Sequence, residues 1–201
     1  MGWDVVRALL LSGGIESSCL AYLEKPEKLI FVDYGQVSAE GEKNAALRVS
    51  DDLGTPLDVI KVGLQSIGSG SMVKKPDVGV SPAPEWWPYR NQTLASVAGA
   101  WGLQNDVKSL IFGSISSDSF HKDGTKLFYD LLSKLMEYQE GGITVEAPAL
   151  GLTPAELVKE SKIPINILSL THSCHTGKFS CGYCRGCRKH YQIFEQLGVE
   201  Y

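Results

Sequence analysis

Short apolar segments alternate with segments of helical periodicity along this chain, and that order constrains the fold more than any other feature of the sequence. The apolar runs at 7–11, 29–32 and 57–62 predict buried strands. The segments 16–24 and 38–53, which lie between them, have the residue spacing of helices. Because strands that alternate with helices form a parallel sheet covered on both faces, the sequence predicts a three-layer α/β fold.

The same alternation returns after residue 88. We predict a strand at 108–112 and an edge strand at 144–147. We predict helices at 92–101, 126–138, 154–162 and 188–197. Thr153 is the predicted N-cap of the helix that starts at Pro154, since proline favours the first helical position and Glu156 lies three residues after the cap.

The segment from Gly63 to Pro88 interrupts this pattern. It is rich in glycine, serine and proline and contains the pair Trp86-Trp87. Loops longer than about 12–15 residues are usually functional or disordered. We therefore predict a cover over an active site, and the alternatives are a disordered linker or a homodimer contact made by the two tryptophans.

The composition indicates one globular domain over residues 1–201, since 43% of the residues are hydrophobic and 21% are charged. The formal net charge of -4 disfavours binding to nucleic acid and favours small-molecule chemistry. The chain has no run of 18 apolar residues, and its first apolar run leads directly into polar Ser12. We therefore predict neither a membrane span nor a signal peptide, and we expect a cytoplasmic protein.

A glycine-rich turn joins the first predicted strand to the first predicted helix, with the sequence Ser12-Gly13-Gly14-Ile15-Glu16-Ser17-Ser18. Glycines let backbone N–H groups approach an anion, hydroxyls add donors, and a helix N-terminus favours negative charge. No lysine stands where a Gly-Lys-Ser/Thr phosphate loop would have one. The turn therefore suits the pyrophosphate side of a nucleotide that is cleaved between its α- and β-phosphates. The alternative is a tight turn without a ligand.

Four of the five cysteines lie close together near the C-terminus, at Cys174, Cys181, Cys184 and Cys187. Four thiolates suit a tetrahedral zinc ion, and a site closed by four protein ligands is structural. We predict a zinc knuckle over 171–188, and the alternatives are a redox Cys-x-x-Cys pair or an iron–sulfur cluster. His172 and His175 are expected to face solvent or substrate, and Cys19 is expected to be a buried small hydrophobe.

Two resemblances sharpen this interpretation. The segment Ser12–Ser17 resembles the Ser-Gly-Gly-x-Asp-Ser signature of the ATP pyrophosphatase superfamily, with Glu16 in place of the aspartate. Several further segments follow in order, namely Asp33-Tyr34-Gly35-Gln36, Arg90-Asn91, Gly113 to Asp118, and Thr171 to Arg188 with its four cysteines. Together they resemble the 7-cyano-7-deazaguanine synthase family of the queuosine pathway over nearly the whole chain.

This resemblance implies an adenine nucleotide alpha-hydrolase-like, Rossmann-like fold and an enzyme that uses ATP, Mg²⁺ and a structural Zn²⁺. It implies that a 7-carboxy-7-deazaguanine carboxylate is activated as an acyl-adenylate and that ammonia then converts it to the amide. A second adenylation would drive dehydration to the nitrile. An adenylate supplies the leaving group that a carboxylate lacks, so the protein mainly positions reactants and stabilises charge.

The resemblance also assigns roles to individual residues. The residues that it places at the nucleotide are Leu11, Ser12, Gly13, Gly14, Ser17, Ser18, Tyr34 and Gln36. It places Glu16 near magnesium, Arg90 at a phosphate or at the substrate carboxylate, and Asp118 at the purine-like ring or at the metal. The other interpretations of three of these residues are a packed aromatic at Tyr34, a surface cation at Arg90 and a turn former at Asp118.

The sequence departs from the family after Asp118, where Ser119 to Gly124 replaces an expected Tyr-Pro-Asp-Cys segment. A relative that joins the activated carboxylate to another amine, such as that of a partner protein, is therefore the second hypothesis. A tRNA-modifying member of the superfamily and a non-enzymatic zinc module are further alternatives. The sequence does not determine whether the protein is a homodimer.

Overall fold

The computed structural model describes residues 5–81 and 83–199, and its centre is a five-stranded sheet in which every pair of neighbours is parallel. The spatial order of the strands is β3-β2-β1-β4-β5. Their bounds are β1 (Arg7–Leu10), β2 (Lys28–Asp33), β3 (Leu57–Lys61), β4 (Ser109–Ile111) and β5 (Thr144–Glu146). All five predicted strands are present, and β5 lies at an edge of the sheet as predicted.

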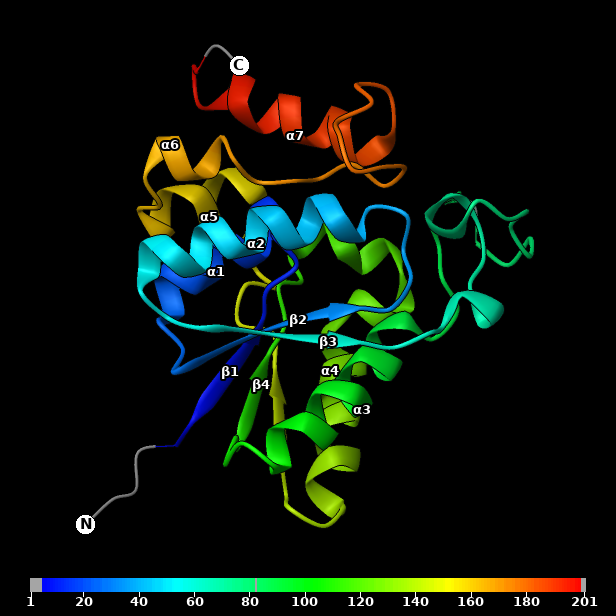
Figure 1. Ribbon diagram of the computed structural model, residues 1–201, viewed down its shortest axis with the longest axis vertical. Coiled ribbons are helices and arrows are strands. Elements are labelled where there is room, and N and C mark those ends of the chain that lie inside the picture. The colour runs from blue at the N-terminus through cyan, green and yellow to red at the C-terminus, as the bar shows by residue number, and fades with distance from the viewer. Residues whose placement is uncertain (1–4, 82, 200–201) are drawn as a thin grey trace.

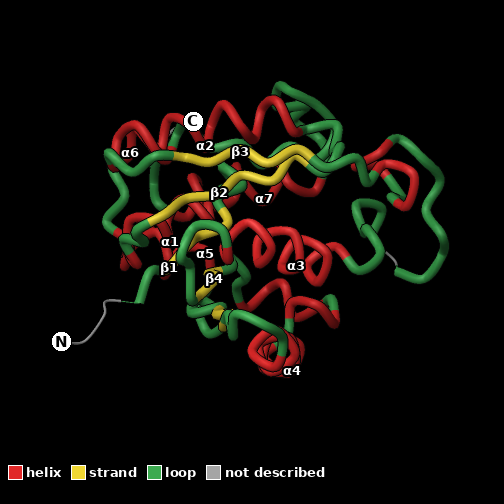
Figure 2. The backbone as a smooth tube through the Cα atoms, turned by 60° about the horizontal axis from the view of Figure 1, so that its bottom comes forward, coloured by secondary structure: helices red, strands yellow, loops and turns green. Residues whose placement is uncertain are grey.

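Helices cover both faces of this sheet, which confirms the predicted three-layer α/β fold (Figures 1 and 2). The helices are α1 (Ile15–Glu24), α2 (Ala39–Leu53), α3 (Arg90–Leu103), α4 (Lys126–Tyr138), α5 (Pro154–Ser161), α6 (Ile165–Leu168) and α7 (Arg185–Gln196). Short 3₁₀ helices lie at η1 (Gln65–Ile67), η2 (Ser71–Val73), η3 (Ser116–Phe120) and η4 (Lys122–Gly124). In the described residues, none of the helices is long and apolar enough to cross a bilayer.

The strands divide their apolar side chains between two cores because successive strand residues point to opposite faces. Leu29 and Phe31 of β2 belong to a core with α1, α2, α5, α6 and α7. Ile30 and Val32 of the same strand belong to a second core with α3 and α4. The continuous apolar runs of the sequence therefore reflect strands that are buried on both sides.

Helix boundaries follow local chemistry. Thr153 caps α5 and forms the predicted capping box with Glu156, and Gly54 ends α2 in the left-handed conformation at φ 66°. The last helix was predicted to begin at residue 188, which is wrong by three residues. The Cys184 Sγ accepts a hydrogen bond from the Cys187 N–H and so acts as the N-cap, which lets α7 begin at Arg185.

The segment 63–88 extends from the carboxyl edge of the sheet beyond β3, where Figure 1 shows it as a protruding lobe. Met72 and Trp87 of this segment are buried, and the Trp87 ring packs edge-on against the Tyr34 ring with centroids 4.9 Å apart. Trp87 therefore packs within the chain. Since Met72 also lines the cavity described below, the position of the segment fits the predicted cover.

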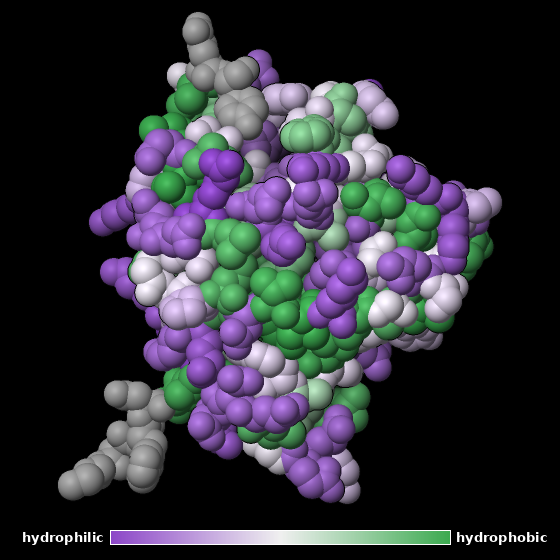
Figure 3. All heavy atoms as spheres, in the orientation of Figure 1, coloured by the Kyte–Doolittle hydropathy of each residue, from purple (hydrophilic) through white to green (hydrophobic). Residues whose placement is uncertain are grey.

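The surface beside β3 is partly apolar. Figure 3 shows apolar side chains gathered near the middle of this face, in the region where β3 and α3 lie in Figure 1. Val59 of β3 is 48% exposed there, and the Trp101 Nε1–H of α3 donates to Asp58 Oδ2 at 3.0 Å. This bond ties α3 to the edge strand.

Candidate active site

A cavity of about 320 Å³ opens at the carboxyl ends of β1, β2 and β4. The chain leaves β1 toward β2 on one side and places β4 on its other side, so the strand order reverses beside β1. Open parallel sheets bind ligands at such a reversal. The predicted residues that line this cavity are Leu11, Ser12, Gly14, Glu16, Ser17, Tyr34, Gln36, Arg90 and Asp118.

The Ser12–Ser17 turn forms one wall of the cavity. The Gly14 N–H donates to Ser12 Oγ at 3.3 Å, and the Ser12 and Ser17 hydroxyls lie 3.0 Å apart. Gly14 is the N-cap of α1 and has no side chain with which to cap it. The first-turn N–H groups of a helix have no acceptor within the helix, so this end of α1 is suited to bind an anion.

Two residues predicted at the nucleotide, Gly13 and Ser18, do not line the cavity. Gly13 has φ +76° and packs against α2, where an added Cβ would lie 2.8 Å from the Ala46 nitrogen. Ser18 is fully buried behind the first turn of α1, and its hydroxyl has no hydrogen-bond partner among the described atoms. In this structure Gly13 permits the turn and Ser18 faces the interior, and their places at the nucleotide stay predictions.

The two glycines of the turn give a matched pair of variants. We expect Gly13→Ala to lower the free energy of unfolding by about 1–3 kcal/mol, because alanine is strained at φ +76° and its methyl group would overlap α2. Gly14 has φ −74°, and a Cβ there would come no closer than 3.4 Å to another group, the Ser12 hydroxyl. Gly14→Ala is therefore expected to have a free energy of unfolding close to that of wild type. Equal loss of stability in the two variants, measured by urea unfolding, would contradict this explanation.

A buried carboxylate that we did not predict lies on the β2 side of the cavity. Glu42, in the first turn of α2, accepts hydrogen bonds from Gln36 Nε2 at 2.7 Å and from Ser38 Oγ at 2.6 Å. The Gln36 Oε1 in turn accepts from the Tyr34 N–H at 3.0 Å. Burial raises the pKa of Glu42. Its position six residues after Gln36 resembles an ordinary solvent-facing helix position, so no sequence signal singled it out.

Arg90 is the main cation on the α3 side of the cavity, and it lies among Tyr34, Glu42, Asp118 and Asp123. Burial by itself lowers the pKa of Arg90, and the negative groups around it outweigh that effect and raise it. Arg90 is therefore not the surface cation of the alternative interpretation. Its Nη1–H also donates to the Met72 sulfur at 3.4 Å, which connects it to the 63–88 segment.

Asp118 lies in η3, where its Oδ2 accepts a hydrogen bond from the Ile115 N–H at 3.1 Å. It therefore shapes a turn and also lines the cavity. Burial raises the pKa of Asp118, and the neighbouring Lys189 opposes that effect. The segment that departs from the family pattern also reaches the cavity, through His121, Asp123 and Gly124.

The C-terminal segment closes the remaining side of the cavity. The His172 N–H donates to the Gly13 carbonyl at 2.8 Å, and Lys189 Nζ of α7 lies 2.7 Å from Glu16 Oε1. His175 and His190 line the cavity as well. Of these residues, His172 and His175 were predicted from the sequence to face solvent or substrate, and both line the cavity. Lys189 and His190 had no signal of their own.

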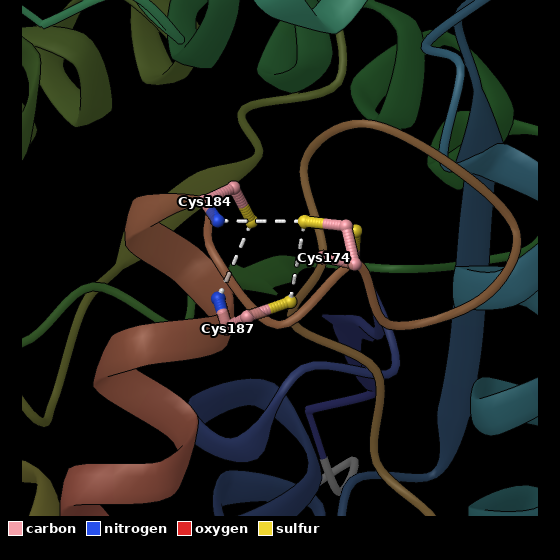
Figure 4. Close-up of side chains that lie close together, drawn as sticks. Cys174, Cys184 and Cys187 are labelled. Atoms are coloured by element: carbon pink, nitrogen blue, oxygen red, sulfur yellow. Dashed lines mark hydrogen bonds between the residues drawn. The ribbon is translucent and has the colours of Figure 1, made fainter.

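The four clustered cysteines lie beside this wall, and their sulfur atoms are all within 4.8 Å of one another. Figure 4 shows Cys184 and Cys187 at the start of α7 and Cys174 on the preceding loop, with their sulfurs directed toward one another. Backbone N–H groups of His175 and Cys184 donate to the sulfurs of Cys184 and Cys181. A tetrahedral zinc ion with Zn–S bonds near 2.3 Å would hold sulfurs roughly 3.8 Å apart, so the donor set and geometry fit a closed metal site.

The fifth cysteine lies apart from this group. Cys19 is fully buried in the core that contains α1. Burial raises the pKa of its thiol to about 12. Its predicted role as a small buried hydrophobe agrees with this position.

The arrangement defines a Rossmann-like α/β protein whose C-terminal four-cysteine segment completes a polar cavity at the carboxyl edge of the sheet. A protein-family model described as "Queuosine biosynthesis protein QueC" matches residues 7–198. The chain belongs to this family.

Three curated relatives of the chain are described as 7-cyano-7-deazaguanine synthases. The 7-cyano-7-deazaguanine synthase 1 of Desulfitobacterium hafniense is 29% identical over 96% of this chain and 94% of its own length. The 7-cyano-7-deazaguanine synthase of Methanothermobacter thermautotrophicus is 29% identical over 97% of both chains. That of Methanocaldococcus jannaschii is 24% identical over 95% of both chains.

Proposed function

We propose that this protein converts 7-carboxy-7-deazaguanine and ammonia to 7-cyano-7-deazaguanine with ATP, through an acyl-adenylate. The observation that carries the proposal is that the Ser12–Ser17 turn, with the first turn of α1, lines one cavity together with Arg90 and Asp118. Such a cavity offers an anion site for a nucleotide and, opposite it, charged groups for a second polar reactant. The names of the similar synthases support the same reaction.

The residues of the chain take the following proposed roles. Ser12, Gly14 and Ser17, with the first-turn N–H groups of α1, bind the pyrophosphate part of ATP. Glu16 holds Mg²⁺, which when bound neutralises phosphate charge. Arg90 directs its guanidinium at the substrate carboxylate or the α-phosphate, since its planar donors match either anion. Asp118 accepts hydrogen bonds from the deazaguanine ring.

The proposed chemistry has two stages. The substrate carboxylate attacks the α-phosphate of ATP and releases pyrophosphate, and ammonia then displaces AMP to form the amide. The amide oxygen attacks a second ATP in the same way, and loss of AMP and a proton gives the nitrile. Both stages need the same placement of a carbonyl oxygen against the α-phosphate, so one cavity serves both.

We further propose that the four-cysteine cluster binds a structural Zn²⁺. Its four thiolates leave no ligand position for substrate, and the hydrogen bonds to its sulfurs are typical of a second shell that orients the ligands. Ile193 and Phe194 of α7 lie in the core that contains α1, which supports a single domain that includes the sheet and the knuckle.

Mass spectrometry of the purified protein with Mg-ATP, 7-carboxy-7-deazaguanine and ammonium tests the reaction. We expect AMP, pyrophosphate and the nitrile, in a ratio of about two AMP for each nitrile by the two-stage scheme above. Formation of AMP without any nitrile would reject the nitrile step and favour transfer of the activated carboxylate to another amine. A complete absence of AMP with every component present would reject the adenylation itself.

A further inference from the structure

The Ser12–Ser17 turn has no lysine of its own, yet the fold brings one to it from the far end of the chain. Lys189 Nζ lies 2.7 Å from Glu16 Oε1, in the first turn of α1. Resting on the proposed function, we propose that Lys189 binds the β- and γ-phosphates of ATP. α7 would thus supply, from a distant part of the same chain, the cation that other phosphate loops carry within their own sequence.

The position of Lys189 fits this role. Lys189, Glu16 and Gly14 all line the same cavity, so the lysine side chain reaches the cavity at the N-terminus of α1, whose first-turn N–H groups have no acceptor within the helix. The Lys189 side chain keeps 35% of its accessible surface. The side chain is therefore partly buried. Its ammonium group is a compact charge on a flexible stem, so it can turn toward a phosphate.

The start of α7 is held in place, which fixes where Lys189 can reach. Gly186 packs so closely on the preceding loop that a Cβ there would overlap the Ser173 carbonyl oxygen and the His175 ring. The Cys184 Sγ accepts from the Cys187 N–H and defines the first turn of α7. Lys189 follows Cys187 by two residues. The knuckle that we propose binds zinc therefore also fixes the position from which Lys189 reaches the cavity.

A purely structural ion pair is a weaker explanation. A second pair, between Lys178 Nζ and Glu40 Oε1 at 2.6 Å, already links the knuckle segment to α2, and Lys178 does not line the cavity. Partly buried ion pairs contribute little net stability because desolvation offsets their attraction. The Glu16–Lys189 pair instead keeps two opposite charges compensated in the cavity until ligand charges replace them. On binding of Mg-ATP, Lys189 turns to phosphate and Glu16 turns to Mg²⁺.

Four variants of the full, zinc-loaded chain test this inference by calorimetry with three probes: ATP, inorganic pyrophosphate and AMP, each without magnesium. We expect Lys189→Met to raise the Kd for ATP and pyrophosphate about 10–100-fold and to leave AMP binding within about twofold, because AMP has no β-phosphate. Lys189→Arg keeps the charge and is expected to recover most of the loss. Glu16→Gln breaks the same ion pair but leaves the lysine free, so pyrophosphate should bind at least as tightly as to wild type.

Lys178→Met is the matched control, since it removes an ion pair of the knuckle segment that lies outside the cavity, and it should bind all three probes like wild type. Equal weakening of every probe by Lys189→Met and Glu16→Gln would show a structural pair and overturn the inference. Wild-type affinity of Lys189→Met for pyrophosphate would overturn it as well, while leaving the proposed function intact. If wild type itself bound neither ATP nor pyrophosphate, the proposed function and this inference would fall together.

Discussion

Loss of the proposed zinc ion from the four-cysteine cluster is expected to abolish ATP binding and to unfold the start of α7, although no cysteine of the cluster lines the cavity. Structural zinc sites contribute about 10–16 kcal/mol of apparent binding free energy in small zinc-binding peptides, and this energy is folding energy. Without the ion, four close thiols no longer fix the loop that joins His172 to α7. Lys189 and the bond from the His172 N–H to Gly13 would then be lost from the cavity wall.

The double variant Cys181→Ser/Cys184→Ser measures this effect. It is expected to contain no zinc by elemental mass spectrometry and to show no measurable ATP binding by calorimetry. Its circular dichroism should lack the helical signal that α7 contributes. Cys19→Ala is the matched control, because it removes the one cysteine that lies in the core rather than in the cluster. The control should keep one zinc per chain and wild-type ATP affinity. A zinc-free double variant that binds ATP normally would show that the knuckle does not shape the site.

Replacement of Arg90 by methionine is expected to reduce turnover by about 10²–10³-fold, the usual cost of removing one charged donor from a transition-state site. Arg90 is the cation that faces Glu42, Asp118 and Asp123, so its removal leaves Glu42 and Asp123 without this charge and Asp118 with Lys189 as its cationic neighbour. We expect a loss of about 1–3 kcal/mol in the free energy of unfolding. For a chain of this size that lowers the melting temperature by roughly 2–4 °C per kcal/mol.

Two further variants separate charge from geometry. Arg90→Lys keeps the charge but lacks the planar donor pair, so stability should recover more than turnover does. Arg48→Met removes an exposed arginine of α2 and should match wild type in both measurements. AMP formation at the wild-type rate by Arg90→Met, measured by chromatography under saturating ATP, would exclude Arg90 from the reaction.

The architecture and the positions of two local motifs followed from the sequence alone. The apolar runs of β1 to β3 and the helical periods between them depend on residues within one element, so a single segment carries the signal. The same holds for the Ser12–Ser17 turn, whose glycines and hydroxyls are adjacent in the chain. The spacing of the four cysteines likewise limits the geometry of the cluster, because short loops keep their ends together.

Which polar side chains share the cavity became visible from the packing of distant elements. Glu42 and Lys189 look like ordinary surface helix residues in the sequence, and each reaches the site because a helix packs on the core in one particular register. Conversely, Gly13 and Ser18 belong to the turn by sequence, and the direction of the backbone turns them toward α2 and the interior. Periodicity specifies which face of an element is apolar, whereas contacts between distant elements depend on packing that no local pattern records.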